Sequence, residues 1–243
     1  MTSHQLPSPI ERLRGRLVVS CQAYPGEPLR DPDAMRRMAL AALEGGAAGI
    51  RAQGLADLRA IRAATDAPLI GLWKDGASGV VITPTAEHVR QVAATGAEIV
   101  ALDATARPRP DGRPLAESFA AAHEAGALVM ADVATFEEGL RAAESGADLV
   151  GTTLSGYTDD SPHLPGPDLE LVSRLAAALD VPVVAEGRIH TPAQAGSALE
   201  AGAFAVVVGT AITHPTTLTR WFAAEVDAAH RPPSRRAAVP PSR

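Results

Sequence analysis

The sequence predicts a single-domain α/β protein, a (β/α)8 TIM barrel, and the prediction depends on three observations. Eight short apolar segments, amphipathic segments between them, and a length of 243 residues are all typical of this fold. Apolar strands that alternate with helices indicate a parallel sheet covered by helices. An open α/β sheet is the alternative, because periodicity alone does not show that a sheet closes.

Five of the eight predicted strands follow a Gly-Ala pair whose glycine ends a helical pattern. Glycine is preferred just past a helix C-terminus, so each pair predicts a turn from helix to strand. The segments are GGAAGIRA, GAEIVALDAT, GALVMADV, GADLVGTT and GAFAVVVGT, with glycines at 46, 96, 126, 146 and 202. RLVVSC supplies the first strand. The remaining two, the third and the seventh in the chain, begin at Pro68 and Pro182, where a missing N–H costs little.

Two of the predicted helices have clear starting residues. Asp31-Pro32 and Thr191-Pro192 each combine an N-cap side chain with proline at the first helical position. Apolar residues then recur on one face of the first helix, at Met35, Met38, Ala39 and Ala42.

We expect one barrel domain over residues 16–230. Residues 1–15 are predicted to be a flexible N-terminal segment. Residues 231–243 are rich in proline and arginine and have no apolar period, so we expect a disordered, solvated tail.

Composition narrows the possible partners and the compartment. A net charge of −6 argues against a nucleic-acid partner. No apolar run is long enough to cross a bilayer, and the first residues lack the apolar core of a secretory signal. The single cysteine, Cys21, rules out an internal disulfide and suggests a small buried apolar residue. Together these features predict a cytoplasmic protein. The histidines show no metal-ligand spacing, so we expect no metal site.

Polar groups follow almost every predicted strand at its C-terminal end. In (β/α)8 barrels, catalytic residues lie at these ends and meet around one mouth. Any one of them could be a solvated strand end, but together they predict a polar pocket. The ends are Cys21-Gln22, Arg51, Lys74, Asp103, Asp132, Thr152-Thr153, Glu186 and Gly209-Thr210.

The last two strands suggest a phosphate site. Gly187-Arg188, in AEGRI, and Gly209-Thr210, in VVGTAI, follow the seventh and eighth strands, where many barrels bind a phosphate. Both glycines could instead be turn formers. A phosphorylated small substrate is the favoured interpretation.

Lys74 ends the apolar run PLIGLWKDG in a chain that otherwise prefers arginine. Burial and a nearby Arg51 would lower the pKa of its amine, whereas Asp132 or Glu186 would oppose that shift. Three interpretations stay open: an inert ion pair with a rim carboxylate, a general base at carbon, and a Schiff-base amine. Glu186 could orient Lys74 or exchange protons with substrate hydroxyls.

Several segments in this order resemble the N-acetylmannosamine-6-phosphate 2-epimerases of sialic acid catabolism. They include LVVSCQA, GGAAGIRAQG, DAPLIGLWK, EIVALDAT, VPVVAEGRIHTP and VVVGTAITHP, and the similarity runs from about Leu17 to Phe222. The resemblance implies interconversion of N-acetylmannosamine 6-phosphate and N-acetylglucosamine 6-phosphate without a cofactor, by a homodimer.

The resemblance also implies roles for single residues. Lys74 matches the acid/base lysine and Glu186 the essential glutamate, while the substrate-binding positions fall on Gln22, Arg51 and Asp132. The reaction would remove the C2 proton, which the C1 aldehyde of the opened sugar acidifies, and return a proton to the other face. Thr153, Gly187, Arg188, Gly209, Thr210 and His214 complete the candidate substrate-binding set.

This chain departs from the family pattern at two places. Asp75-Gly76 replaces the usual RDY or RNY after the lysine, and His214 stands where the family has an arginine against the phosphorylated end. An imidazole does not reproduce a bidentate guanidinium. These departures leave open a phosphosugar-binding protein with weakened catalysis. A Schiff-base lyase or aldolase on a related sugar phosphate is also kept, because a barrel lysine can form an imine.

Overall fold

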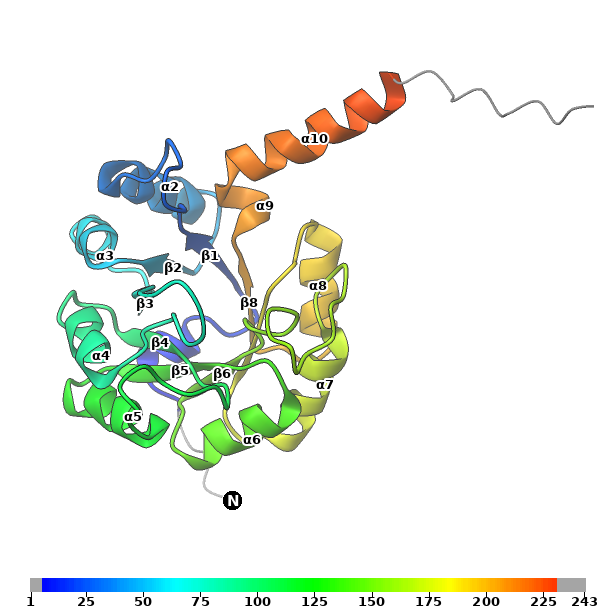
Figure 1. Ribbon diagram of the computed structural model, residues 1–243. Coiled ribbons are helices and arrows are strands. Elements are labelled where there is room, and N and C mark those ends of the chain that lie inside the picture. The colour runs from blue at the N-terminus through cyan, green and yellow to red at the C-terminus, as the bar shows by residue number, and fades with distance from the viewer. Residues whose placement is uncertain (1–5, 231–243) are drawn as a thin grey trace, which may run out of the picture.

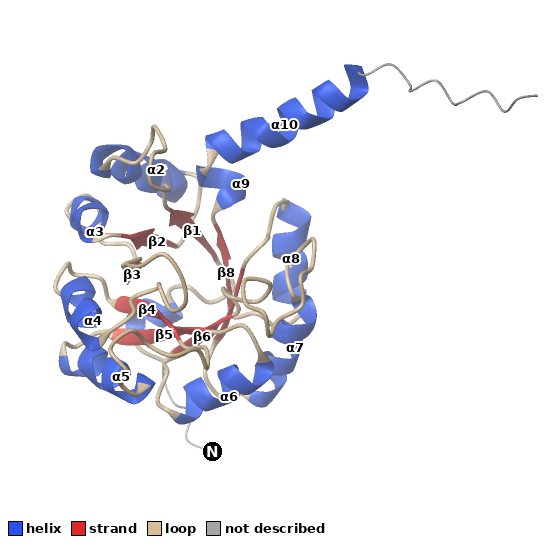
Figure 2. Ribbon diagram, viewed as in Figure 1, coloured by secondary structure: helices blue, strands red, loops and turns tan. Residues whose placement is uncertain are grey.

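The eight predicted strands form a closed parallel barrel in the computed structural model, which describes residues 6–230. Each strand pairs with its neighbour in the chain, and β1 also pairs with β8 through Val18 and Val207, so the sheet has no edge. The barrel prediction is confirmed, and the open sheet is excluded (Figure 2). The strands are β1 Leu17–Cys21, β2 Gly49–Gln53, β3 Leu69–Leu72, β4 Ile99–Asp103, β5 Leu128–Asp132, β6 Leu149–Gly151, β7 Val183–Glu186 and β8 Ala205–Val208.

Helices surround the barrel on the outside, as Figure 1 shows for α2 to α8. The described helices are α1 Ser8–Glu11, α2 Pro32–Glu44, α3 Leu55–Arg62, α4 Ala86–Ala93, α5 Leu115–Glu124, α6 Phe136–Glu144, α7 Leu169–Ala178, α8 Pro192–Glu200, α9 Thr210–Thr213 and α10 Pro215–His230.

The local signals for helix starts and ends are confirmed. Asp31 accepts hydrogen bonds from the amides of Asp33 and Ala34, and Thr191 forms a capping box with Gln194. The five glycines of the Gly-Ala pairs all have positive φ, between 75° and 101°, which L side chains rarely adopt.

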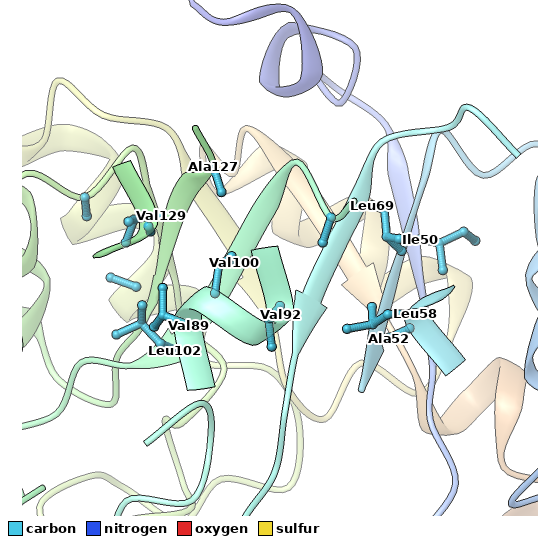
Figure 3. Close-up of a cluster of buried hydrophobic side chains, with 14 of the residues drawn as sticks. Ile50, Ala52, Leu58, Leu69, Val89, Val92, Val100, Leu102, Ala127 and Val129 are labelled. Atoms are coloured by element: carbon cyan, nitrogen blue, oxygen red, sulfur yellow. The ribbon is translucent and has the colours of Figure 1, made fainter. Parts of the chain in front are cut away.

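The outer core fills the space between the strands and the helices. Figure 3 shows part of it, where Ile50, Val100 and Val129 of the strands belong to one buried cluster with Leu58 and Val92 of the helices. Since successive strand residues point to opposite faces, Arg51 between Ile50 and Ala52 must point into the barrel. The apolar outer face therefore decides which strand residues reach the interior.

The expectation of a flexible segment over residues 1–15 is wrong for its described part. Residues 8–11 form α1, and Ile10 and Leu13 are fully buried among the inward-facing residues of the barrel. Gly15 donates its amide hydrogen to Phe204, just before β8, so the segment closes the end of the barrel where the strands begin. Leu6, Ile10 and Leu13 have helical spacing, but the segment is short and mostly polar, so this pattern alone did not predict a buried helix. The tail prediction for 231–243 lies outside the described residues.

The last helix, α10, extends away from the barrel instead of packing over β8 (Figure 1). None of its residues is buried, and Phe222 and Val226 are 74% and 67% exposed. Across residues 6–230, the helices are all too short or too polar to span a membrane.

Candidate active site

The polar ends of the strands surround one cavity of about 370 Å³ at the C-terminal mouth of the barrel. Of the residues singled out from the sequence, Gln22, Lys74, Thr153, Glu186, Gly187, Arg188, Gly209, Thr210 and His214 line it. Arg51 and Asp132 do not line it and are at most 1% exposed. The predicted pocket therefore exists, with these two charged residues directly beneath its floor.

Arg51 and Asp132 form a buried ion pair that joins β2 to β5 across the interior. The guanidinium donates from Nη2 to Asp132 Oδ2 at 2.6 Å and from Nη1 to Asp132 Oδ1 at 3.1 Å. Burial acts to lower the pKa of Arg51, but Asp132 and Glu186 outweigh it and raise the pKa, so the guanidinium stays charged. The two hydrogen bonds to Asp132 fix the orientation of the Arg51 guanidinium, so Arg51 can serve as a rigid support for the residues above it.

Glu186 connects this buried pair to the cavity. Its Oε2 lies 3.1 Å from Arg51 Nη1 and accepts a hydrogen bond from Thr153 Oγ1 at 3.2 Å. Thr153 Oγ1 also lies 2.6 Å from Asp132 Oδ1. Burial raises the pKa of Glu186 to about 7, helped by the charge of Asp132 and opposed by Arg51 and Lys74. A carboxyl in this state can both hold and release a proton near neutral pH.

Lys74 lies two residues past β3 and is the only lysine of the chain. Within residues 6–230, no carboxylate oxygen lies within 4 Å of its ammonium, which removes the interpretation of an inert ion pair. Burial lowers the pKa of Lys74, Arg51 lowers it further, and Glu186 and Asp132 oppose the shift. The residue is nevertheless open to solvent on the cavity side, and that access limits the effect of burial.

The strand order places the strands that lead to Lys74 and Glu186 on opposite sides of the barrel. In a closed ring of eight strands, β3 and β7 are four positions apart and face each other. Both side chains line the same cavity, so a molecule bound between them has one group on each side. This arrangement can carry out proton transfer at one atom from two directions.

The loops after β7 and β8 form the other end of the cavity. Gly187 has a φ of 110°, and Arg188 follows in the left-handed region at 54°, where a side chain is strained. The guanidinium of Arg188 compensates by donating to Gly166 O at 2.9 Å and to Ser155 O, and it lies over the Tyr157 ring. Gly209 leads directly into α9. Backbone amides and a cation thus gather at this end.

His214 lies behind this end and is 5% exposed. Its ring packs 5.0 Å from the ring of Tyr24, and its Nδ1 lies 3.8 Å from Glu27 Oε2, too far for a hydrogen bond. Burial lowers the pKa of His214, and Lys74 adds to this while Glu27 opposes it. The imidazole is therefore neutral at pH 7, which agrees with its expected weakness as a phosphate ligand.

Sequence reasoning missed three contributors to the cavity. The centre of the Tyr24 ring lies 5.6 Å from the Lys74 ammonium. Arg107, from the loop after β4, and the loop with Gly79 and Val81 also line the cavity. Tyr24 and Arg107 each follow a predicted rim residue by a few positions, and that spacing was the available signal. Asp103, a rim candidate, is fully buried and pairs with Arg107 at 2.6 Å instead of lining the cavity.

Cys21 is fully buried, and burial raises the pKa of its thiol to about 12, so its prediction as a small apolar residue is confirmed. Among the described residues, no group of three or more His, Cys, Asp or Glu side chains is placed to hold a metal ion. The expectation that the protein needs no cofactor stays a prediction.

Fold and cavity together define an enzyme of the (β/α)8 class, with a mouth equipped for acid–base chemistry on a small polar molecule. Residues 35–228 match a family model described as "Putative N-acetylmannosamine-6-phosphate epimerase". Two relatives named "Putative N-acetylmannosamine-6-phosphate 2-epimerase" are similar over most of their length. The one from Cutibacterium acnes is 55% identical over 216 residues, which cover 88% of this chain and 94% of the relative. The one from Clostridioides difficile is 46% identical over 220 residues, covering 90% and 99%.

A solved structure gives the same assignment. The N-acetylmannosamine-6-phosphate 2-epimerase from Clostridium perfringens matches with a TM-score of 0.87 at 42% identity, covering 93% of this chain and 99% of that chain. The chain belongs to the N-acetylmannosamine-6-phosphate 2-epimerase family, as the motifs indicated.

Proposed function

We propose that this protein interconverts N-acetylmannosamine 6-phosphate and N-acetylglucosamine 6-phosphate by proton transfer at C2. One observation carries the proposal: Lys74 and Glu186 face each other across one cavity, with their pKa values shifted in opposite directions toward neutrality. An amine with a lowered pKa and a carboxyl with a raised pKa are the pair that general acid–base catalysis at pH 7 requires.

In the proposed reaction, the neutral amine of Lys74 removes the C2 proton of the opened sugar. The electron pair of the C–H bond forms a C1–C2 double bond, and the charge moves to the C1 oxygen. Gln22 lines the cavity and can donate a hydrogen bond to that oxygen. Protonated Glu186 then supplies a proton to C2 from the opposite side, which inverts the configuration. Solvent and the sugar hydroxyls restore the two groups.

Arg51 and Asp132 are proposed to position these groups rather than to contact the sugar. Both are buried beneath the cavity, and Arg51 touches Glu186 directly. Their charges also act on the pKa of Lys74, in opposite directions. This differs from the direct substrate contact that the resemblance implied for these residues.

The phosphate is proposed to bind at the loops after β7 and β8. Gly187 and Gly209 line the cavity there, and Arg188 and Thr210 adjoin them. Such loops bind phosphate in many (β/α)8 barrels because their backbone amides are accessible. His214 lies at the same end and contributes less than a guanidinium would.

The lyase and the inactive binding protein are not favoured. The family matches are to epimerases, and both proton carriers are present in the cavity. A lyase would also use a neutral Lys74, but it would form an imine with the sugar. Borohydride added with the phosphosugar would trap that imine on Lys74, whereas proton transfer by an epimerase leaves no adduct. Because Lys74 is the only lysine, peptide mapping of a reduced adduct has a single lysine side chain to consider.

Solvent deuterium exchange tests the proposed function. Wild-type protein in deuterium oxide with either phosphosugar is expected to place deuterium at C2 of both epimers, as read by NMR. Lys74→Ala is expected to slow epimerisation, and exchange in the epimer whose C2 proton faces Lys74, about 10²–10⁴-fold, the usual contribution of a general base.

Glu186→Gln separates the two proton carriers in the same assay. It is expected to keep exchange in one epimer while conversion to the other falls, because the amine still works from its own side. A correctly folded Lys74→Ala variant with unchanged rates would refute the mechanism. Wild-type protein without exchange in either sugar would refute the function.

A homodimer and a cytoplasmic location are also proposed. The dimer is supported by α10, whose apolar residues Trp221, Phe222 and Val226 are exposed on a helix that leaves the barrel (Figure 1). Apolar surface of this kind is typical of a helix that packs against a partner subunit. The location is supported by the single, buried cysteine, which suits a reducing compartment.

A further inference from the structure

We propose that Arg107 binds the acetyl carbonyl of the substrate and makes the cavity specific for 2-acetamido sugars. This assignment deepens the proposed function and rests on it. Arg107 lies in the loop after β4 and lines the cavity, with its side chain 29% exposed.

Two residues hold the Arg107 guanidinium in place. Its Nη2 donates to Asp103 Oδ2 at 2.6 Å, and its Nε donates to Thr105 Oγ1 at 3.0 Å. Asp103 is fully buried and is itself held by the amide and hydroxyl of Thr105, at 3.0 and 2.7 Å. The side chain is therefore fixed before any ligand binds, which favours recognition.

The other arginines near the mouth are engaged elsewhere. Arg109, two residues further on, is 9% exposed and donates to the carbonyls of Pro84, Asp103 and Thr83. Arg188 donates from Nε to Gly166 O and from Nη1 to Ser155 O, and it lies in the loop after β7, at the proposed phosphate end. In the described part of the chain, Nη1 of Arg107 has no hydrogen-bond partner. Arg107 thus offers free N–H donors to the cavity.

The strand order places Arg107 opposite the proposed phosphate end. In the eight-strand ring, β4 faces β8, and β3 with Lys74 lies beside β4 (Figure 1). A substrate with its phosphate at the loops after β7 and β8 must bring C2 to Lys74. The acetamido group on C2 then lies between β3 and β4, at Arg107. A neutral carbonyl oxygen there accepts a charge-assisted hydrogen bond.

Two open-chain ligands that do not react test this assignment. N-acetylglucosaminitol 6-phosphate and glucitol 6-phosphate differ only in the C2 substituent, acetamido or hydroxyl. Isothermal titration of wild-type protein should show tighter binding of the acetamido compound. Arg107→Met should weaken that compound about tenfold or more and change the affinity for glucitol 6-phosphate less than about twofold.

Two further variants control for charge and folding. Arg113→Met removes a cation from the same loop, but Arg113 pairs with Glu117 at 2.8 Å and does not line the cavity, so both affinities should stay unchanged. Arg107→Lys keeps the charge near Asp103 but loses the planar fork, and should lose most of the acetamido preference.

Equal weakening of both ligands by Arg107→Met would show general charge attraction and overturn the assignment, as would no weakening. Wild-type protein that binds neither compound and shows no deuterium exchange would instead refute the proposed function, and this assignment with it.

Discussion

At the residue scale, the charge balance around Lys74 is the property on which the proposed chemistry depends. One guanidinium and two carboxylates lie beneath or beside the amine, and its pKa reflects burial first and then their competition. Removing one partner of a buried ion pair leaves an uncompensated charge, so these groups are hard to change singly. The resulting pKa of Lys74 can be measured directly, because the chain has no other lysine.

We predict that the amine of Lys74 titrates below the ordinary lysine value. Protein labelled with ¹⁵N at the lysine ζ position should give one signal, whose pH dependence reports this pKa by NMR. Glu186→Gln should lower the pKa further, because it removes a negative charge that stabilises the ammonium. A midpoint at or above the ordinary value in the wild type would contradict the prediction.

Asp75→Asn is the matched control for this titration. Asp75 is the next residue in the chain, but its carboxylate turns toward His88, with Oδ2 at 3.1 Å from Nε2. It is not among the charges that act on Lys74. The lysine signal of this variant should therefore titrate as in the wild type.

At the scale of the elements, the distance between neighbouring helices depends on small residues at chosen positions. Gly139 of α6 faces the fully buried Leu175 of α7, and a Cβ added at Gly139 would lie 2.3 Å from Leu175 Cδ2. Gly196 of α8 has nothing within 4 Å of the same added atom. The two glycines share a helical setting and differ only in the space beside them.

We predict opposite effects of alanine at these two glycines. Gly196→Ala should stabilise the protein by up to about 1 kcal/mol, because alanine favours the helix. Gly139→Ala should destabilise it by about 1 kcal/mol or more, since overpacking outweighs the same gain. Chemical unfolding in urea measures both changes in the free energy of unfolding. Equal shifts in the two variants would contradict the packing argument.

At the scale of the whole molecule, α10 stands apart, because this 16-residue helix leaves the barrel and has no buried residue. Its neighbours in the fold cover the strands, whereas α10 presents Phe222 and Val226 to solvent (Figure 1). A stable subunit interface would bury this surface and offset its exposure.

We predict that Phe222→Asp yields a monomer while the wild type is a dimer. A charge at the centre of an apolar interface loses its hydration when the subunits associate, which opposes association. Light scattering after size-exclusion chromatography gives the mass of each. Ala120→Asp places the same charge on the exposed face of α5, far from α10, and should remain dimeric. A monomeric wild type would refute the dimer.

Local patterns were enough to predict the eight strands and the helices between them, whereas closure of the sheet depends on the pairing of β1 with β8. Glycines past helix ends, caps such as Asp31 and Thr191, and eight apolar strands each depend on neighbouring residues, so a single chain displays them. Because parallel strands in a barrel share one mouth, the rim residues at their ends, including Lys74 and Glu186, could also be placed together from the sequence.

What only the tertiary structure decided concerns depth and partners across the barrel. Arg51 and Asp132 are 81 positions apart, and their pairing beneath the cavity depends on the alternation and stagger of β2 and β5. The burial of Ile10 and Leu13 depends on the open end of a barrel that is complete only after β8 forms. The free donor of Arg107 depends on its contacts with Asp103 and Thr105. Sequence spacing specifies which strand end carries a side chain, whereas its depth and its charged neighbours exist only once the sheet has closed.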